Sequence, residues 1–166
     1  VAAVIPEVVF GYDTDTMESV VLDLLRQRGL TIGVAESVTG GLVAGRLTAT
    51  AGASDVMRGG VVAYASEVKF DLLGVPRGPV ISEETSRAMA LGVCHTVGSA
   101  VGLALTGVAG PDEQDGAKVG TLCIAVAMPG GVASSTTVML PGDRKTMREL
   151  AVISALNYLR QLLLRS

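Results

Sequence analysis

Apolar residues recur along the chain with two spacings, which predict helices and strands in alternation. Between 17 and 29 they return every three or four positions, which predicts a packing helix that ends at Gly29. Continuous apolar runs at 31–35 and 100–105 predict buried strands, because a strand covered on both faces loses the usual alternation. The run at 59–64 predicts another buried strand.

Polar cap residues and helix breakers set the remaining boundaries. Asp15 and Glu18 have the spacing of a capping box at the first helix, and Ser82 precedes a turn rich in glutamate. Further helices are predicted over 42–49, 66–73, 82–97 and from Asp143 onward, and a hairpin over 120–127 and 132–139. The last helix is expected to bury one face, made of Met147, Leu150, Ala151, Ser154 and Tyr158.

Strands that alternate with helices, followed by a hairpin, are typical of the α/β class. We therefore predict a three-layer α/β/α sandwich with a mixed, mostly parallel sheet. Residues 13–166 are expected to form this single domain. Residues 1–12 hold two short apolar stretches, interrupted by Pro6 and Gly11, and are expected to be a lead-in or an interdomain linker.

Composition narrows the function classes. Hydrophobic residues make up 49% of the 166 positions but aromatic residues only 3%, so the core is aliphatic. The net charge of −3 provides no basic surface for nucleic acid. No apolar run reaches the roughly 20 residues of a membrane span, and no secretion signal is visible. We expect a cytoplasmic protein in which Cys94 and Cys123 are free thiols.

The most informative stretch is 31–41, where a predicted strand turns into a helix around Ser37. Such a turn lies at the carboxyl edge of the sheet, where open α/β sheets bind ligands, and the helix N–H groups suit an anion such as phosphate. Ser37 is either a nucleophile or a helix cap, and the pattern alone leaves both open. The stretch is neither a G-x-S-x-G elbow, since Ala35 and Thr39 occupy the glycine positions, nor a phosphate-binding G-K-S/T loop.

A nucleophilic serine requires a base. His95, the only histidine, lies in the middle of a predicted helix, which disfavours a Ser–His–Asp triad. Lys69 follows the predicted strand that ends at Tyr64, and a desolvated lysine can accept a serine proton. A solvated lysine on a short helix is the alternative. Glu36 and Asp112 offer a third possibility, an acid/base pair or a hard-cation site.

Five motifs in register resemble the CinA C-terminal domain family from about Val9 to the end of the chain. They are A-E-S-V-T-G-G at 35–41, Tyr64-x-x-Glu67-x-Lys69, T-G-V-A-G-P-D at 106–112, V-G-T at 119–121 and P-G-D-R at 141–144. Val38, Ser66 and the 113–118 loop depart from the family pattern. The segment 9–13 resembles the junction that follows the N-terminal domain of longer members.

The resemblance implies the activity and the site. The family's known activity is hydrolysis of the carboxamide of nicotinamide mononucleotide (NMN) to nicotinate mononucleotide and ammonia, with no cofactor and no metal. It implies Ser37 as nucleophile and Lys69 as its base. It also implies that Tyr64 is a catalytic residue. The positions implied for substrate binding are Glu36, Thr39, Gly40, Gly41, Thr106, Gly107 and Arg144.

Two further expectations accompany this reading. The aliphatic composition and the resemblance both favour a homodimer. A protein of the same fold that binds or senses a nucleotide without turnover is the alternative function, motivated by Ser66 and the altered 113–118 loop. A DNA-binding role fits poorly with the acidic charge.

Overall fold

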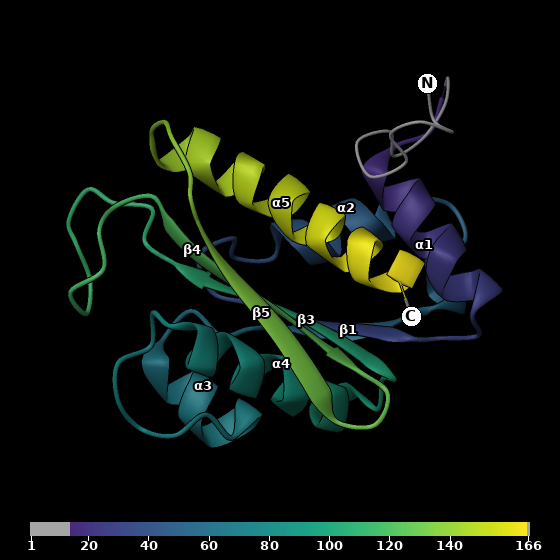
Figure 1. Cartoon of the computed structure of the whole chain (residues 1–166), viewed down its shortest axis with the longest axis horizontal. Coiled ribbons are helices and arrows are strands. Elements are labelled where there is room, and N and C mark those ends of the chain that lie inside the picture. Colours follow the sequence, from purple (N-terminus) through teal and green to yellow (C-terminus); the bar gives the residue numbers. More distant parts are fainter. Residues whose placement is uncertain (1–13, 166) are drawn as a thin grey trace.

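A five-stranded mixed sheet forms the centre of the computed structural model, which describes residues 14–165 (Figure 1). The strand order is β2-β1-β3-β4-β5. The strands are β1 (Ile32–Glu36), β2 (Met57–Val62), β3 (Val101–Gly107), β4 (Thr121–Met128) and β5 (Val132–Met139). The predicted lead-in, 1–12, lies outside the described residues.

Strand directions confirm a mixed sheet. β1 pairs in parallel with both β2 and β3, whereas β4 is antiparallel to β3 and to β5. β5 therefore runs in the same direction as the three parallel strands, and only β4 is reversed. The parallel strands β2, β1 and β3 end at one edge of the sheet, as parallel strands joined by crossovers do.

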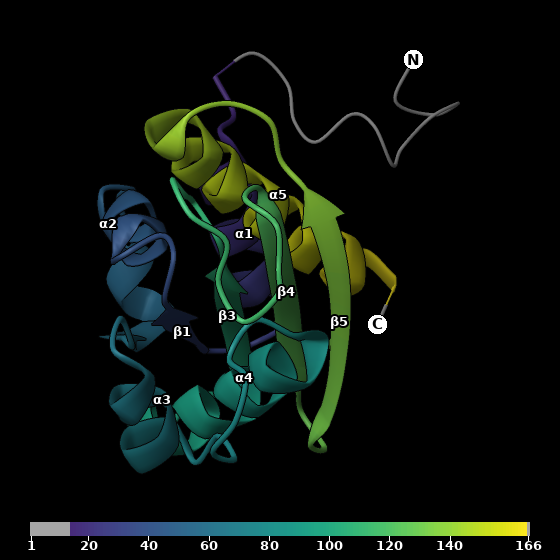
Figure 2. The ribbon, with the colours of Figure 1, turned by 90° about the vertical axis from the view of Figure 1, so that its left-hand side faces the viewer.

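Helices cover both faces of the sheet (Figures 1 and 2). One layer consists of α1 (Met17–Gln27), α2 (Leu42–Thr48) and α5 (Arg144–Arg165). The other consists of α3 (Ser66–Leu73) and α4 (Glu83–Val97). A short 3-10 turn, η1 (Ala53–Asp55), leads into β2. The predicted α/β/α sandwich is confirmed. Within 14–165, no helix combines the length and apolarity that crossing a bilayer requires.

The two faces of the sheet carry side chains of different size. Large aliphatic side chains of the central strands join the core cluster with α1, α2 and α5: Val34, Leu103, Leu105, Leu122 and Ile124. Alanines of the same strands face the smaller cluster with α4: Ala35, Ala104 and Ala125. These small residues let α4 approach the sheet closely. The approach is so close at Gly102 that a Cβ there would lie only 2.0 Å from the carbonyl oxygen of Ala90. Glycine at 102 is therefore a packing requirement.

Three local expectations were wrong or incomplete. The capping box of α1 uses Thr16 and Ser19 rather than Asp15 and Glu18, because the Glu18 side chain is buried and ion-paired with Arg46 of α2. β2 alternates half-buried and exposed positions, since it is an edge strand that pairs only with β1.

The third expectation concerns α5. Its N-terminus is capped as predicted, with Asp143 accepting a hydrogen bond from the Thr146 N–H at 2.9 Å. Its buried face includes the expected Met147 and Ala151 but then follows a different set: Val152, Ala155, Leu156, Leu159 and Leu163. The helix packs on the sheet and on α1, so a wider surface is covered than a single stripe.

Candidate active site

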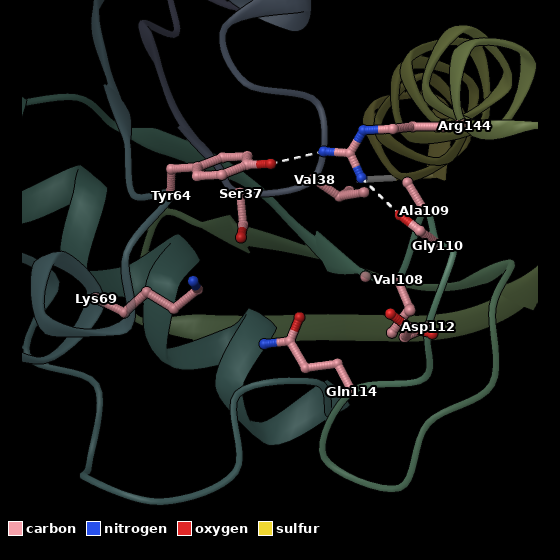
Figure 3. A pocket seen from close by; sticks show the side chains of 11 residues that line it. Ser37, Val38, Tyr64, Lys69, Val108, Ala109, Gly110, Asp112, Gln114 and Arg144 are labelled. Carbon is pink, nitrogen blue, oxygen red and sulfur yellow. Dashed lines mark hydrogen bonds between the residues drawn. The ribbon is translucent and has the colours of Figure 1, made fainter.

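A pocket opens at the carboxyl edge of the parallel strands, where the sequence predicted a ligand site. Ser37 follows β1, Tyr64 follows β2, Gly107 ends β3, and Arg144 begins α5. These residues line the pocket together with Lys69 of α3 (Figure 3). Its cavity volume is about 140 Å³, smaller than the roughly 300–1,000 Å³ of sites that enclose a drug-sized ligand.

Ser37 is not a helix cap. The N-cap residue of α2 is Gly41, which has no side-chain hydrogen bond to make. The Ser37 backbone is held instead by its N–H, which donates to Leu105 of β3 at 3.0 Å, and by its carbonyl, which accepts from Gly40 at 3.1 Å. The hydroxyl points into the pocket (Figure 3). The capping alternative is therefore wrong.

Glu36 takes over the capping of α2. Its buried carboxylate accepts three backbone hydrogen bonds, from Gly41 at 3.1 Å, Val43 at 3.0 Å and Ala44 at 2.8 Å. These N–H groups would otherwise be unpaired at the helix N-terminus. Glu36 thereby fixes the turn that follows Ser37, but its side chain does not line the pocket.

Lys69 is buried in the wall of the pocket, with 2% of its surface exposed. Burial lowers the pKa of its ammonium, and the negative charges of Asp115 and Glu67 oppose this shift. Within residues 14–165 no salt bridge or hydrogen bond is recorded for its Nζ. A lysine in this setting loses its proton more readily than a surface lysine.

Ser37 extends into the pocket from the end of β1 and Lys69 extends into it from α3 (Figure 3). No hydrogen bond joins Ser37 Oγ to Lys69 Nζ in the part of the chain that the structure describes. Proton transfer between them therefore needs a closer approach or one bridging water, and catalytic hydrogen bonds often shorten only when substrate binds.

Arg144 forms a bridge across the mouth of the pocket (Figure 3). Its guanidinium donates to the Tyr64 hydroxyl at 2.6 Å and to the Gly110 carbonyl at 2.9 Å. Tyr64 is 61% exposed, so this bridge lies at the rim. A guanidinium has five N–H donors, and those that remain can bind an anion.

The other expected substrate-binding residues are mostly engaged by the protein itself. The Gly40 N–H donates to the Ser37 carbonyl, and the Gly41 N–H donates to Glu36. Thr106 is buried and its hydroxyl donates to the Val80 carbonyl at 2.8 Å. Thr39 is fully buried, and its Oγ1 has no partner among residues 14–165. Neither Thr39 nor Thr106 lines the pocket.

The structure does not bring together the residues of the two other candidate sites, the serine–histidine pair and the Glu36–Asp112 pair. His95 lies exposed on α4 and does not line the pocket, so it cannot serve Ser37. Asp112 lines the pocket but Glu36 does not, and the Glu36 carboxylate is used by α2. Among the described residues, no group of three or more His, Cys, Asp or Glu side chains could hold a metal ion.

Sequence reasoning missed several contributors. Gln114 lines the pocket, and Asp115 faces Lys69 while its Oδ2 accepts from the Val80 N–H at 2.8 Å. Both lie in the 113–118 loop, whose sequence departs from the family pattern and carries no motif that indicates a pocket residue. Arg148 of α5 contacts the turn after Ser37. It is four residues after Arg144, a spacing that could have indicated a shared helix face.

Fold and pocket together define an α/β/α domain with a buried serine and a buried lysine at the carboxyl edge of its sheet. The family model described as CinA C-terminal domain matches residues 14–163. The chain belongs to this family, as the sequence resemblance indicated.

Individual relatives agree with this assignment. A CinA-like protein of Frankia casuarinae is 51% identical over 160 residues, which cover 93% of this chain and 37% of the relative. A CinA-like protein of Synechocystis sp. is 44% identical over 161 residues, covering 92% and 38%. The chain thus spans about two fifths of the length of these curated relatives.

Solved structures share the fold. A CinA superfamily protein from Klebsiella pneumoniae superposes with a TM-score of 0.85 at 27% identity, covering 92% of this chain and all of the other. One from Escherichia coli gives 0.81 at 30% identity, covering 96% and 98%. The described fold is therefore the fold of this superfamily.

Proposed function

We propose that this domain hydrolyses the carboxamide of NMN to nicotinate mononucleotide and ammonia, with Ser37 as nucleophile and Lys69 as base. The observation that supports it most is the pairing of a buried serine with a buried lysine of lowered pKa in one pocket. Membership of the CinA C-terminal domain family supports the same reaction.

The reaction proceeds in two halves. Neutral Lys69 accepts the proton of Ser37 as Oγ attacks the carboxamide carbon, and the carbonyl oxygen becomes an oxyanion. The C–N bond then breaks, the proton passes from Lys69 to the leaving nitrogen, and ammonia departs from an acyl-enzyme. A water molecule, deprotonated by Lys69, attacks this ester, and its collapse returns the proton to Ser37 and releases the nicotinate.

The oxyanion and the phosphate need separate partners. The N–H groups of Val38 and Thr39, directly after Ser37, have no hydrogen-bond acceptor among residues 14–165. Val38 lines the pocket, so its N–H can stabilise an oxyanion, whereas Thr39 is fully buried outside the pocket. The N–H groups of Gly40 and Gly41 are occupied. Arg144 is therefore the proposed phosphate partner, since its guanidinium lines the pocket and keeps unused donors.

Release of ammonia from NMN by the purified chain tests the proposal. Ser37→Ala and Lys69→Ala are expected to lose the activity, whereas Lys145→Ala, at an exposed position of α5, retains it. Full activity in either of the first two variants would overturn the mechanism.

Ser37 Oγ and Lys69 Nζ share no hydrogen bond in the described structure, which favours one alternative, a domain that binds NMN without converting it. Heat of binding in calorimetry with no ammonia after long incubation would support that alternative. The homodimer expected from the sequence stays a prediction, which light scattering of the purified chain tests.

A further inference from the structure

Arg148 holds the turn that follows Ser37. Its Nε donates to the Val38 carbonyl at 3.1 Å and its Nη2 donates to the Thr39 carbonyl at 2.8 Å. One half-buried guanidinium thus binds two successive peptide units, 110 and 109 positions away in the sequence. This fork matches the planar geometry of arginine and cannot be reproduced by lysine.

The contact fixes the direction of the neighbouring N–H groups. These peptide bonds are trans, so the N–H of a peptide unit points opposite to its C=O. Arg148 binds the Val38 carbonyl, and the Thr39 N–H of the same unit therefore points away from the guanidinium. The Ser37 carbonyl accepts from Gly40, which fixes the Val38 N–H in the same manner.

Most backbone N–H groups along the turn already have acceptors within the protein. Those of Ser37, Gly40, Gly41, Leu42, Val43 and Ala44 all donate to protein acceptors. Within residues 14–165, those of Val38 and Thr39 are the two without a recorded acceptor. They are also the two that immediately follow the serine. Of the two, only Val38 lines the pocket, because Thr39 is fully buried.

Gly40 gives independent support for the importance of this contact. Its φ of +60° is a left-handed conformation that suits glycine, and a Cβ there would lie 3.3 Å from Nη2 of Arg148. Glycine at 40 therefore leaves room for the guanidinium as well as for the turn. No substrate contact is needed to explain it.

We infer that Arg148 is a positioning residue that orients and polarises the Val38 N–H as an oxyanion donor for Ser37. The inference rests on the proposed Ser37 chemistry but adds a residue that does not line the pocket. The link to Val38 is a chain: Arg148 binds the Thr39 carbonyl, and the Gly40 N–H of the same peptide donates to the Ser37 carbonyl, whose peptide carries the Val38 N–H. A cation at the start of this chain strengthens the last N–H as a donor, because hydrogen bonds in a chain polarise one another. Arg144, one helical turn away, faces the substrate instead.

The first test separates kcat from KM for NMN in Arg148→Gln and Arg148→Lys. An oxyanion donor acts in the transition state, so kcat is expected to fall about 100-fold in Arg148→Gln with KM changed less than about threefold. Arg148→Lys keeps the charge but not the fork and should lie between. Glu149→Gln, at the next and exposed position of α5, is the matched control and should behave as wild type. Melting temperatures identify any variant that has lost its fold.

A second measurement does not depend on NMN turnover. A small fluorophosphonate forms a bond between its phosphorus and Ser37 Oγ, the P–F bond breaks, fluoride leaves, and the serine proton passes to Lys69. The phosphoryl oxygen uses the same oxyanion donor, so labelling of Ser37 should slow about 100-fold in Arg148→Gln. Labelling at the wild-type rate in both variants would overturn the inference.

The two readouts separate the two proposals. If the wild type labels at Ser37 but releases no ammonia from NMN, the proposed substrate fails, and the labelling rates alone decide the role of Arg148. If wild-type Ser37 neither reacts with the probe nor supports hydrolysis, then it is not activated and both proposals are overturned.

Discussion

The Glu36 carboxylate and the Gly41 backbone N–H are joined by a hydrogen bond of 3.1 Å across the turn that contains Ser37. This contact turns a residue expected to bind substrate into the internal cap of α2. It also removes the Gly41 N–H, with those of Val43 and Ala44, from the donors available to a phosphate. The conformation of the Ser37 turn therefore depends on a buried carboxylate directly before the serine.

Replacement of Glu36 should destabilise the domain. Glu36→Ala leaves three N–H groups without their acceptor, so the free energy of unfolding is expected to fall by about 2–3 kcal/mol. Glu36→Gln keeps an acceptor oxygen and should cost less. Urea denaturation measures both, with Glu149→Ala, an exposed glutamate of α5, as the control. An Ala variant as stable as wild type would show that the cap is dispensable.

Lys69 should be unfavourable for stability because it is buried without an ion pair in the described structure. At neutral pH, Lys69→Met is expected to raise the free energy of unfolding by about 1 kcal/mol while abolishing hydrolysis, a typical trade between stability and activity. Thermal melts and ammonia release measure the two effects. Lys145→Met, at an exposed position, should change neither.

The sign of the pH dependence provides a second check on Lys69. Its pKa in the folded state lies below the ordinary value of 10.5, so the unfolded chain binds this proton more tightly. Wild-type stability therefore rises with pH between the folded-state pKa and 10.5. The stability gap between Lys69→Met and wild type should narrow over that window, and a gap that widens would contradict the assignment.

Asp115 should set the pH at which Lys69 loses its proton. Its negative charge favours the ammonium and raises the pKa of Lys69 against the effect of burial. Asp115→Asn keeps an oxygen for the Val80 N–H but removes the charge, so the rising limb of the pH profile of kcat/KM should move to lower pH. Asp71→Asn, an exposed carboxylate of α3 paired with Arg77, should leave the profile unchanged.

The fold was predictable where local signals and burial agreed. α3 has the predicted bounds, and α4 follows its predicted cap Ser82, because capping and breaker residues act within a few positions. The place of β2 at the edge of the sheet depends on which strands pair with one another. A local sequence pattern does not contain that information. The apolar run of β2 therefore suggested a burial that the edge position does not provide.

The candidate site was likewise only partly predictable from the sequence. Ser37 and Lys69 enter one pocket because β1 and β2 are neighbours. From the sequence, their proximity could be predicted only on the assumption that these two strands pair. Glu36, Asp115 and Arg148 act through backbone groups that are 5, 35 and 110 positions away. A carboxylate beside a serine or an arginine on a helix has many uses, and only the three-dimensional contacts select one.

The bridge between Arg144 and Tyr64 yields a prediction about substrate binding. Tyr64→Phe removes the acceptor that orients the guanidinium, so KM for NMN should rise about tenfold with little change in kcat, as loss of a hydrogen bond to a charged group implies. Arg144→Met should raise KM further, because the proposed phosphate contact is lost as well.

A substrate without phosphate separates this role from general damage to the pocket. Nicotinamide riboside carries the same carboxamide and ribose but no phosphate for Arg144 to bind, so kcat/KM for its hydrolysis should be nearly equal in wild type and Arg144→Met. The phosphate contact would be refuted by an equal loss on both substrates, which would instead assign Arg144 to the shape of the rim through its bonds to Tyr64 and Gly110.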